Sequence, residues 1–303
     1  TDLALETLKR LKNRKEPFYM ALGYYRPHLP FVAPRKYWDL YQRDSLPLAP
    51  NPYHPKNSPP MAAGGTYELA DCYDIASRVN INAEKQPEDI ARLLKHGYYA
   101  SVSYIDACLG KLMKGLEEMG LAENTIVVIW GDNGWKLCEN GGWCKQTNYN
   151  IDSRVPLLIL APGIKGKGKS CDRLTELVDL YPTVCDLAGL PIDPELQGSS
   201  MVPLLNDPSI QWKDHVFSQF QHALGTGKNR VFYMGFSMNT DRYHLVEWYI
   251  WDDVNKVKKD FVARELYDHL ADPQENINVA DDPQNGAIIK QLSEKLNTGW
   301  NKN

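Results

Sequence analysis

Short apolar runs predict three buried strands in the first half of the chain. Residues 125–130 (TIVVIW) and 155–160 (VPLLIL) are unbroken and rich in aliphatic side chains, which is typical of a parallel sheet covered on both faces. Residues 18–23 (FYMALG) have the same pattern. Ligands of open α/β sheets bind where strands end, because side chains there converge on a crevice. We therefore expect a site at the ends of these runs.

Helical periodicity covers three further segments. Residues 87–120 carry apolar side chains spaced mostly by three or four, and shorter amphipathic patterns occupy residues 2–13 and 287–296. Residues 34–62 are rich in proline, which interrupts both helices and sheets. We expect an extended surface segment there.

The pattern changes near residue 206. Residues 231–236 and 243–251 are aromatic and alternating, which predicts antiparallel strands. The chain is therefore divided into residues 1–205, part of an α/β domain, and residues 206–303, a small antiparallel-sheet subdomain with a terminal helix.

Composition narrows the possible partners. The 303 residues can bury a sizeable core, and the net charge of −4 gives no reason to expect nucleic acid. No apolar run approaches the ~20 residues of a membrane helix, so no membrane partner is expected. The chain starts as an amphipathic helix and not as a signal peptide, which suggests a mature or truncated chain. Of the six cysteines, Cys138 and Cys144 flank the central loop and either pair or stay free.

Candidate chemistry gathers after the strand at 125–130. Asp132 and Asn133 both offer oxygen, which suits a hard cation such as Ca²⁺ better than zinc. Lys145 follows in a loop with Trp135 and Trp143 and could meet an anionic substrate. The simpler alternative is that Asp-Asn-Gly is only a turn.

Two other motifs have simple alternatives as well. Residues 163–170 (GIKGKGKS) fit a phosphate-binding loop pattern, but Asp172 would place an acid where the phosphate-binding helix begins, so a solvated turn is favoured. His28 stands between two prolines, where a histidine usually bonds to the backbone of its own loop.

Taken together, the central motifs resemble the sulfatase family of the alkaline-phosphatase-like superfamily, and within it the iduronate-2-sulfatase-like branch. That branch carries Asp-His-Gly-Trp, Gly-Glu-His-Gly, Trp, Lys and a Val-Pro-Leu strand, with Lys-Pro-His-x-Pro-Phe earlier. The corresponding segments here are residues 132–135 (DNGW), 138–141 (CENG), Trp143, Lys145, residues 154–157 (RVPL) and residues 26–31 (RPHLPF). Asn133 keeps an oxygen ligand, whereas Asn140 and Cys138 are unusual replacements.

The resemblance implies an alkaline-phosphatase-like α/β fold with a mixed, largely parallel sheet flanked by helices. It implies Ca²⁺ ligation by Asp132 and Asn133. It also implies that Lys145 bridges the sulfate and the leaving oxygen, and that His28 contacts the sulfate and acts as the acid. Substrate contacts are expected from Trp135, Trp143 and Arg26, which stands where the family has lysine.

Part of the family's machinery has no counterpart in this sequence. The strand ending in paired Asp is missing, and none of the six cysteines has Pro or Ala two places on and Arg four places on, as the formylglycine motif requires. Two side chains are also too few for Ca²⁺, which takes about six to eight oxygen ligands. We expect formylglycine and the other ligands to come from an N-terminal sulfatase segment or chain that completes the sheet, and residues 1–303 alone to be inactive.

The resulting hypothesis is part of an exported or lysosomal sulfatase that acts on a sulfated saccharide. Uronate 2-sulfate in glycosaminoglycans or a related polysaccharide is the expected substrate. One alternative is a catalytically inactive sulfatase-like protein that binds sulfated glycans. Another is a phosphate-ester hydrolase of the same superfamily, against which the Arg26-Pro27-His28 segment argues.

Overall fold

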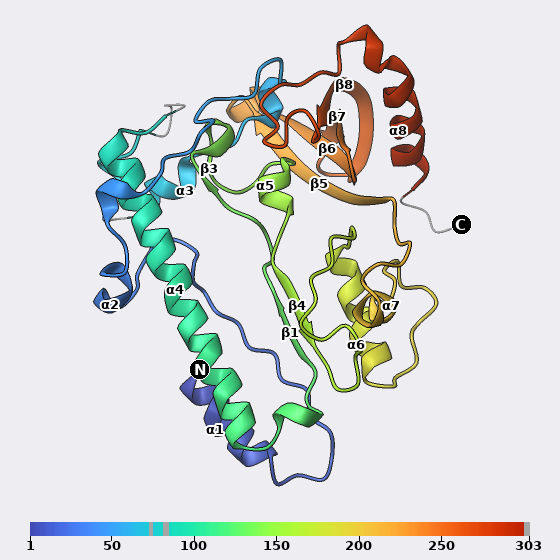
Figure 1. Ribbon diagram of the computed structural model, residues 1–303. Helices are drawn as coiled ribbons and strands as arrows, with labels where there is room; N and C mark the ends of the chain where they lie inside the picture. The colour runs from blue at the N-terminus through green and yellow to red at the C-terminus, as the bar shows by residue number, and fades with distance from the viewer. Residues whose placement is uncertain (73–74, 81–84, 300–303) are drawn as a thin grey trace.

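A long helix and a short helix beside it form one side of the molecule (Figure 1). The computed structural model describes residues 1–72, 75–80 and 85–299. Helix α4 (Glu88–Glu118) and helix α1 (Asp2–Leu11) confirm the predicted helices at 87–120 and 2–13. A Cβ atom at Gly115 of α4 would lie 2.2 Å from Leu5 Cδ2 of α1. The two helices are therefore closely packed there, and a larger residue at position 115 would require the Leu5 side chain to shift.

The two predicted central strands exist but pair in the other direction. Strands β1 (Val127–Trp130) and β4 (Leu157–Leu160) are antiparallel, with Val127 opposite Leu160. The prediction of neighbouring parallel strands is therefore wrong for this pair. A parallel connection needs a crossover of a dozen or more residues, usually a helix. Between β1 and β4 the structure has only one-turn helices and a small hairpin, so the chain returns antiparallel.

The β1–β4 pair is also more exposed than expected. Trp130 is 51% exposed and Leu158 is 52% exposed. The predicted strand at residues 18–23 is not a strand in the structure but irregular chain, and Tyr19 there is 83% exposed. A strand needs a hydrogen-bonded neighbour, and within the described residues this segment has none.

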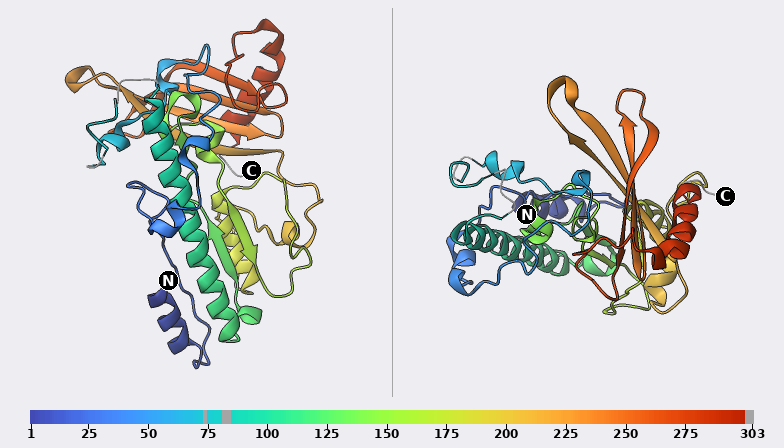
Figure 2. Two further views of the ribbon diagram at one scale, coloured as in Figure 1. Left: turned by 60° about the vertical axis from the view of Figure 1, so that its left-hand side comes forward. Right: turned by 90° about the horizontal axis from the view of Figure 1, so that it is seen from above.

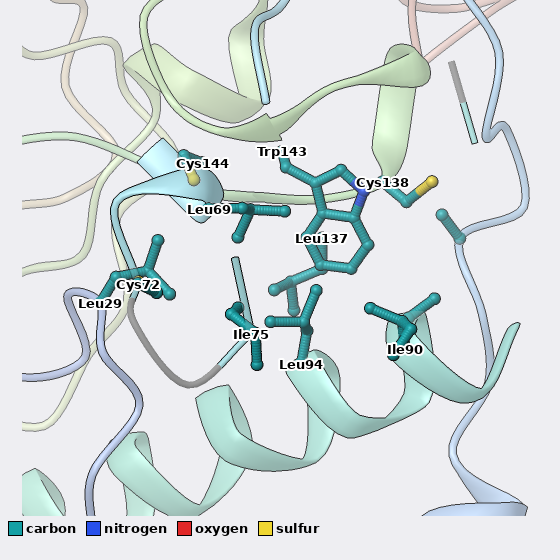
Figure 3. Close-up of a cluster of buried hydrophobic side chains, with 12 residues drawn as sticks. Leu29, Leu69, Cys72, Ile75, Ile90, Leu94, Leu137, Cys138, Trp143 and Cys144 are labelled. Carbon is teal, nitrogen blue, oxygen red and sulfur yellow. The ribbon is translucent and has the colours of Figure 1, made fainter. Parts of the chain in front are cut away.

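A small hairpin carries the central loop into the core (Figure 3). Strands β2 (Lys136–Leu137) and β3 (Trp143–Cys144) pair antiparallel. Figure 3 shows the Trp143 ring among Leu94 and Ile90 of α4 and Leu137 of β2, and Trp143 is only 1% exposed. This buried cluster anchors the loop to the long helix.

The C-terminal part is a four-stranded antiparallel sheet covered by a helix (Figures 1 and 2). The order is β5-β6-β7-β8, and β6 and β7 confirm the strands predicted at 231–236 and 243–251. Helix α8 packs on the sheet through Ile289, Leu292 and Leu296 and confirms the predicted terminal helix. The domain boundary at 205/206 stays a prediction. The bounds are β5 (His215–Leu224), β6 (Val231–Thr240), β7 (Tyr243–Asp252), β8 (Val257–Asp268) and α8 (Gly286–Thr298).

The proline-rich segment joins the two parts instead of only covering the surface. Met61 and Ala62 are buried against Trp248 of the C-terminal sheet, and Lys56 forms an isolated parallel bridge with Ile277. The segment is mostly extended, as predicted, but these buried positions correct the expectation of a surface segment. The remaining short elements are α2 (Arg35–Trp38), η1 (Arg43–Ser45), η2 (Pro60–Ala62), α3 (Tyr67–Ala70), η3 (Ala122–Asn124), η4 (Glu139–Gly141), α5 (Asn150–Ser153), η5 (Leu177–Asp179), α6 (Leu180–Leu187), α7 (Val202–Asn206), η6 (Gly227–Asn229) and η7 (Pro283–Asn285).

Mixed helices and sheets place the chain in the α/β class, as expected from the sequence. Among the described helices, none is both long and apolar enough to cross a membrane.

Candidate active site

The loop after β1 is held in place by the segment that precedes β4. The backbone N–H of Gly131 donates to the carbonyl of Pro156 at 3.1 Å, and that of Gly134 donates to the carbonyl of Asp152 at 2.7 Å. A Cβ atom at Gly134 would lie 1.9 Å from a backbone carbonyl oxygen, so only glycine allows this approach. Asp132 and Asn133, between the two anchors, lie at the end of β1.

A buried ion pair fixes the loop that follows. Lys136 is fully buried and pairs with Asp152, while its ammonium donates to Thr147 Oγ1 at 2.8 Å. Burial lowers the pKa of Lys136, and the neighbouring Asp152 opposes that shift. Thr147 also donates its backbone N–H to Asp152 at 2.9 Å. Removing either charge would leave the other unpaired in the interior, which is far more costly than the pair itself is stabilising.

Lys145 lies between these fixed points on an unusual backbone. Its neighbours Cys144 and Gln146 have φ angles of +72° and +80°, in a region that side chains other than glycine rarely adopt. Such strain persists only where the surroundings impose it, and it gathers at functional sites. It therefore marks Lys145 as a residue that the surrounding fold holds in a set position.

Lys145 and His28, 117 positions apart in sequence, are in direct contact. Lys145 Nζ lies 3.0 Å from His28 Nε2 and 2.9 Å from Glu68 Oε2. The ammonium also lies 4.8 Å from the centre of the Trp135 ring, which is a cation–π distance. The Trp135 ring meets the His28 ring edge-on, with centroids 5.4 Å apart. The two predicted catalytic residues therefore share one aromatic wall.

His28 takes its orientation from its own loop. Its Nδ1 lies 2.9 Å from the carbonyl of Leu29, which can only accept a hydrogen bond. Arg26 donates to the backbone carbonyls of Val32 at 3.0 Å and His28 at 3.4 Å. His28 therefore bonds to its own loop, as the flanking prolines predict, and also lies in the candidate site, as the resemblance predicts.

One cavity of about 1920 Å³ connects the metal and lysine candidates. Asp132, Asn133 and Lys145 all line it. The structure thus brings together five of the seven predicted site residues, counting His28 and Trp135 through their contacts with Lys145.

Trp143 lies elsewhere, so its predicted substrate contact is corrected. It is 1% exposed within the core cluster of β2, β3 and α4. Tryptophan is amphipathic, and its place in the sequence beside Lys145 did not distinguish a wall of the site from an anchor beneath it.

The donor chemistry of Asp132 and Asn133 fits Ca²⁺, but the number of ligands does not complete a site. The two side chains offer at most three oxygens. Within residues 1–72, 75–80 and 85–299, the one group of three or more His, Cys, Asp or Glu close enough to share an ion is His244, His269 and Glu275. Asp132 does not belong to that group, so no cluster of three or more such side chains among the described residues includes it.

Several other motifs have structural roles. The first helix after residues 163–170 is η5, which begins at Leu177. A phosphate-binding loop leads directly into a helix, so the structure does not support that interpretation of this segment. Asn140, which replaces the family's second histidine, is buried and donates to the backbone carbonyls of Gln274 and Glu275. His96 bonds to the carbonyl of Trp38 at 2.8 Å. Cys138 and Cys144 do not form a disulfide with each other.

Glu68 is the residue of the site that sequence reasoning missed. It lies on the one-turn helix α3, 77 positions from Lys145, and it carries no motif of its own. Only the tertiary contact reveals it.

Two family models match this chain. The family model described as Sulfatase matches residues 1–190, and the model described as N-sulphoglucosamine sulphohydrolase, C-terminal, matches residues 138–302. Iduronate 2-sulfatase of Mus musculus is 28% identical, with 96% of this chain and 63% of that protein covered. Arylsulfatase K of Gallus gallus is 30% identical, with 92% of this chain and 51% of that protein covered. The chain thus spans less than two thirds of these relatives.

Solved structures show the same fold. One solved structure, described as a complex with its substrate D-glucosamine-2-N,6-O-disulfate, has a TM-score of 0.76 at 20% identity, covering 98% of this chain and 68% of the other. The phosphonate monoester hydrolase of Silicibacter pomeroyi has a TM-score of 0.73 at 25% identity, covering 98% of this chain and 59% of the other.

Proposed function

Because the chain belongs to the sulfatase family, we propose that it forms part of a sulfuric-ester hydrolase that removes sulfate from sulfated sugars. The observation that carries the proposal is the contact of Lys145 with His28 over Trp135, beside the cavity that Asp132 and Asn133 also line. A fixed cation, a proton carrier and oxygen ligands in one place match the needs of sulfate transfer.

In this proposal the chain's own residues bind the ester and manage a proton. Lys145 holds a sulfate oxygen and the bridging oxygen, and Trp135 keeps its ammonium in place. His28 lies next to Lys145 and gives a proton to the departing sugar oxygen. Asp132 and Asn133 would hold Ca²⁺, which when bound neutralises charge on the sulfate. The nucleophile, a formylglycine, would come from outside residues 1–303.

The proposed substrate is a uronate 2-sulfate of a glycosaminoglycan or related polysaccharide. The likeness to iduronate 2-sulfatase over 96% of this chain supports it. The charge of the whole chain is −4, so a polyanionic sugar would be attracted by local cations such as Lys145 and not by the overall field. An exported or lysosomal location goes with such a substrate and is part of the proposal.

We further propose that an N-terminal sulfatase segment or chain packs on the exposed side of β1 and β4. Leu158 and Leu160 are both exposed on one face of this pair, and the irregular segment at 18–23 is rich in apolar side chains. A strand edge with apolar faces is a ready template for further strands. The relatives' greater length supports the same reading.

A catalytically inactive, glycan-binding sulfatase-like protein is the second candidate. The observation in its favour is Asn140, whose side chain bonds to the turn at 274–275 where an active-site histidine is expected from the resemblance. A phosphate- or phosphonate-ester hydrolase is less favoured, although one such enzyme shares the fold.

The test is an assay of the native protein with a 4-nitrophenyl ester of sulfate, phosphate or phosphonate and with a uronate 2-sulfate disaccharide, with and without a calcium chelator. We expect chelator-sensitive hydrolysis of sulfate esters. Lys145→Ala should lower kcat/KM at least a hundredfold, because a charge-stabilising contact at the reacting group is typically worth about 10²–10³. Lys165→Ala, which removes an exposed lysine of the basic loop, should leave it unchanged.

Each alternative has its own outcome. Glycan binding without turnover in the native protein would favour the inactive homologue. Faster hydrolysis of phosphate or phosphonate than of sulfate would favour the third candidate. Full activity of Lys145→Ala would refute the role assigned to this residue.

A further inference from the structure

The contact between Lys145 and Glu68 has no place in the roles described so far. We propose that Glu68 is a positioning residue that holds Lys145 and stabilises the protonated form of His28, at the expense of ground-state sulfate binding. The expected effect on kcat rests on the proposed function. The contacts among Glu68, Lys145 and His28 do not depend on it.

Glu68 is placed by the core and not by chance contact. The next residue, Leu69, is fully buried in the cluster around Trp143, and the backbone N–H of Trp143 donates to the carbonyl of Gly65. The Glu68 side chain is 15% exposed and that of Lys145 is 17% exposed. A carboxylate held this way at 2.9 Å from an ammonium interacts with little screening by solvent.

The hydrogen bonds assign the protons of the resting site. Because the carbonyl of Leu29 can only accept, His28 Nδ1 carries a proton. Lys145 has three N–H groups, and it donates to Glu68 Oε2 and to His28 Nε2. His28 Nε2 is therefore an acceptor, and the ring is neutral. Its Nε2 must gain a proton before His28 can act as an acid.

Glu68 is the anion that favours this protonation. Its Oε2 lies 3.6 Å from His28 Nε2. Among the described residues in contact with His28, the other charged ones are Lys145 and Arg26, both cations that oppose a positive imidazole, and the aromatic Tyr25 and Trp135 carry no charge. Without Glu68 the acid form of His28 would face two cations and no anion among these neighbours.

The same carboxylate works against the substrate's own charge. A sulfate approaching Lys145 must share the ammonium with Glu68 and tolerate a negative neighbour. Loss of the charge should therefore tighten binding of free sulfate while it slows turnover. A merely structural role would weaken both, because a displaced Lys145 would neither bind sulfate nor act on the ester.

The experiment uses the native protein with Glu68→Gln, Glu68→Asp and the control Glu6→Gln, which changes an exposed glutamate of α1. NMR of ¹⁵N-labelled histidine, assigned with His28→Gln, reports the tautomer of His28. Calorimetry with inorganic sulfate reports ground-state binding, and 4-nitrophenyl sulfate reports kcat.

We expect the Nδ1–H tautomer in the native protein. In Glu68→Gln sulfate should bind about tenfold more tightly, because the ammonium of Lys145 is no longer shared with a carboxylate, and kcat should fall about tenfold. Glu68→Asp should restore part of each effect, and Glu6→Gln should change none.

Weaker sulfate binding accompanied by lower kcat in Glu68→Gln would overturn the inference, and so would unchanged sulfate binding. If the native protein hydrolyses no sulfate ester but the sulfate affinity shifts as stated, the proposed function fails while the placement of Glu68 stands.

Discussion

Glu275 holds the C-terminal sheet to the central loop, and its replacement by glutamine should lower stability in a pH-dependent way. The carboxylate is buried and accepts hydrogen bonds from His244 Nδ1 at 2.5 Å, His269 Nε2 at 2.9 Å and the backbone N–H of Asn150 at 2.8 Å. The first two partners belong to the sheet region, and the third belongs to α5. Glutamine has nearly the same shape but carries no charge, so the substitution isolates the charge.

The magnitude follows from the pKa of this group. Burial would raise the pKa of Glu275, but His244, His269 and the Asn150 N–H outweigh it and lower the pKa from 4.5 to about 2. At 1.36 kcal/mol per pKa unit, the ionised carboxylate contributes about 3 kcal/mol to the free energy of unfolding. A lowered pKa in the folded state means that this stability is fully present above about pH 4.5. It is lost as the pH falls towards 2, and about 1.4 kcal/mol remains at pH 3.

The measurement is urea denaturation of the native protein and of Glu275→Gln, followed by tryptophan fluorescence at pH 7, 4 and 3. We expect the variant to be less stable by about 3 kcal/mol at pH 7, with the difference roughly halved at pH 3. Glu195→Gln, which changes an exposed glutamate, should behave like the native protein at every pH. A difference below 1 kcal/mol at pH 7, or one that stays constant down to pH 3, would refute this account of the charge.

Two further predictions concern the core beneath the site. Trp143→Ala should lower the free energy of unfolding by about 3–5 kcal/mol, because it leaves a cavity in the core cluster, whereas Trp143→Phe should lower it much less. Equal losses for the two variants in urea denaturation would contradict the packing role of Trp143. Burial raises the pKa of the Cys144 thiol, so Cys144 should resist iodoacetamide at pH 8 in the folded protein while the exposed Cys171 reacts. Peptide mass spectrometry identifies the modified cysteine, and modification of Cys144 before Cys171 would contradict its burial.

The local sequence pattern was sufficient to predict the helices and the existence of the strands. Helix α4 and the β6–β7 pair repeat their apolar positions with periods that depend only on near neighbours along the chain, so the sequence was enough to locate them. The local sequence did not determine whether two strands pair parallel or antiparallel. The runs that became β1 and β4 have the same composition in either pairing, and the connection at 131–156, which holds a small hairpin and one-turn helices but no crossover helix, decided their direction.

Candidate residues were identified from the sequence where a motif carried them, as with Asp132, Lys145 and His28. By itself, the chain's sequence determined which side chains were available and which segments would be helical, because both depend on residue type and short-range spacing. The tertiary structure alone decided that Lys145 meets His28, that Glu68 joins them and that Trp143 lies beneath the site. Those contacts join positions up to 117 residues apart, and only the packing of α4, the hairpin and α3 brings them within hydrogen-bond distance.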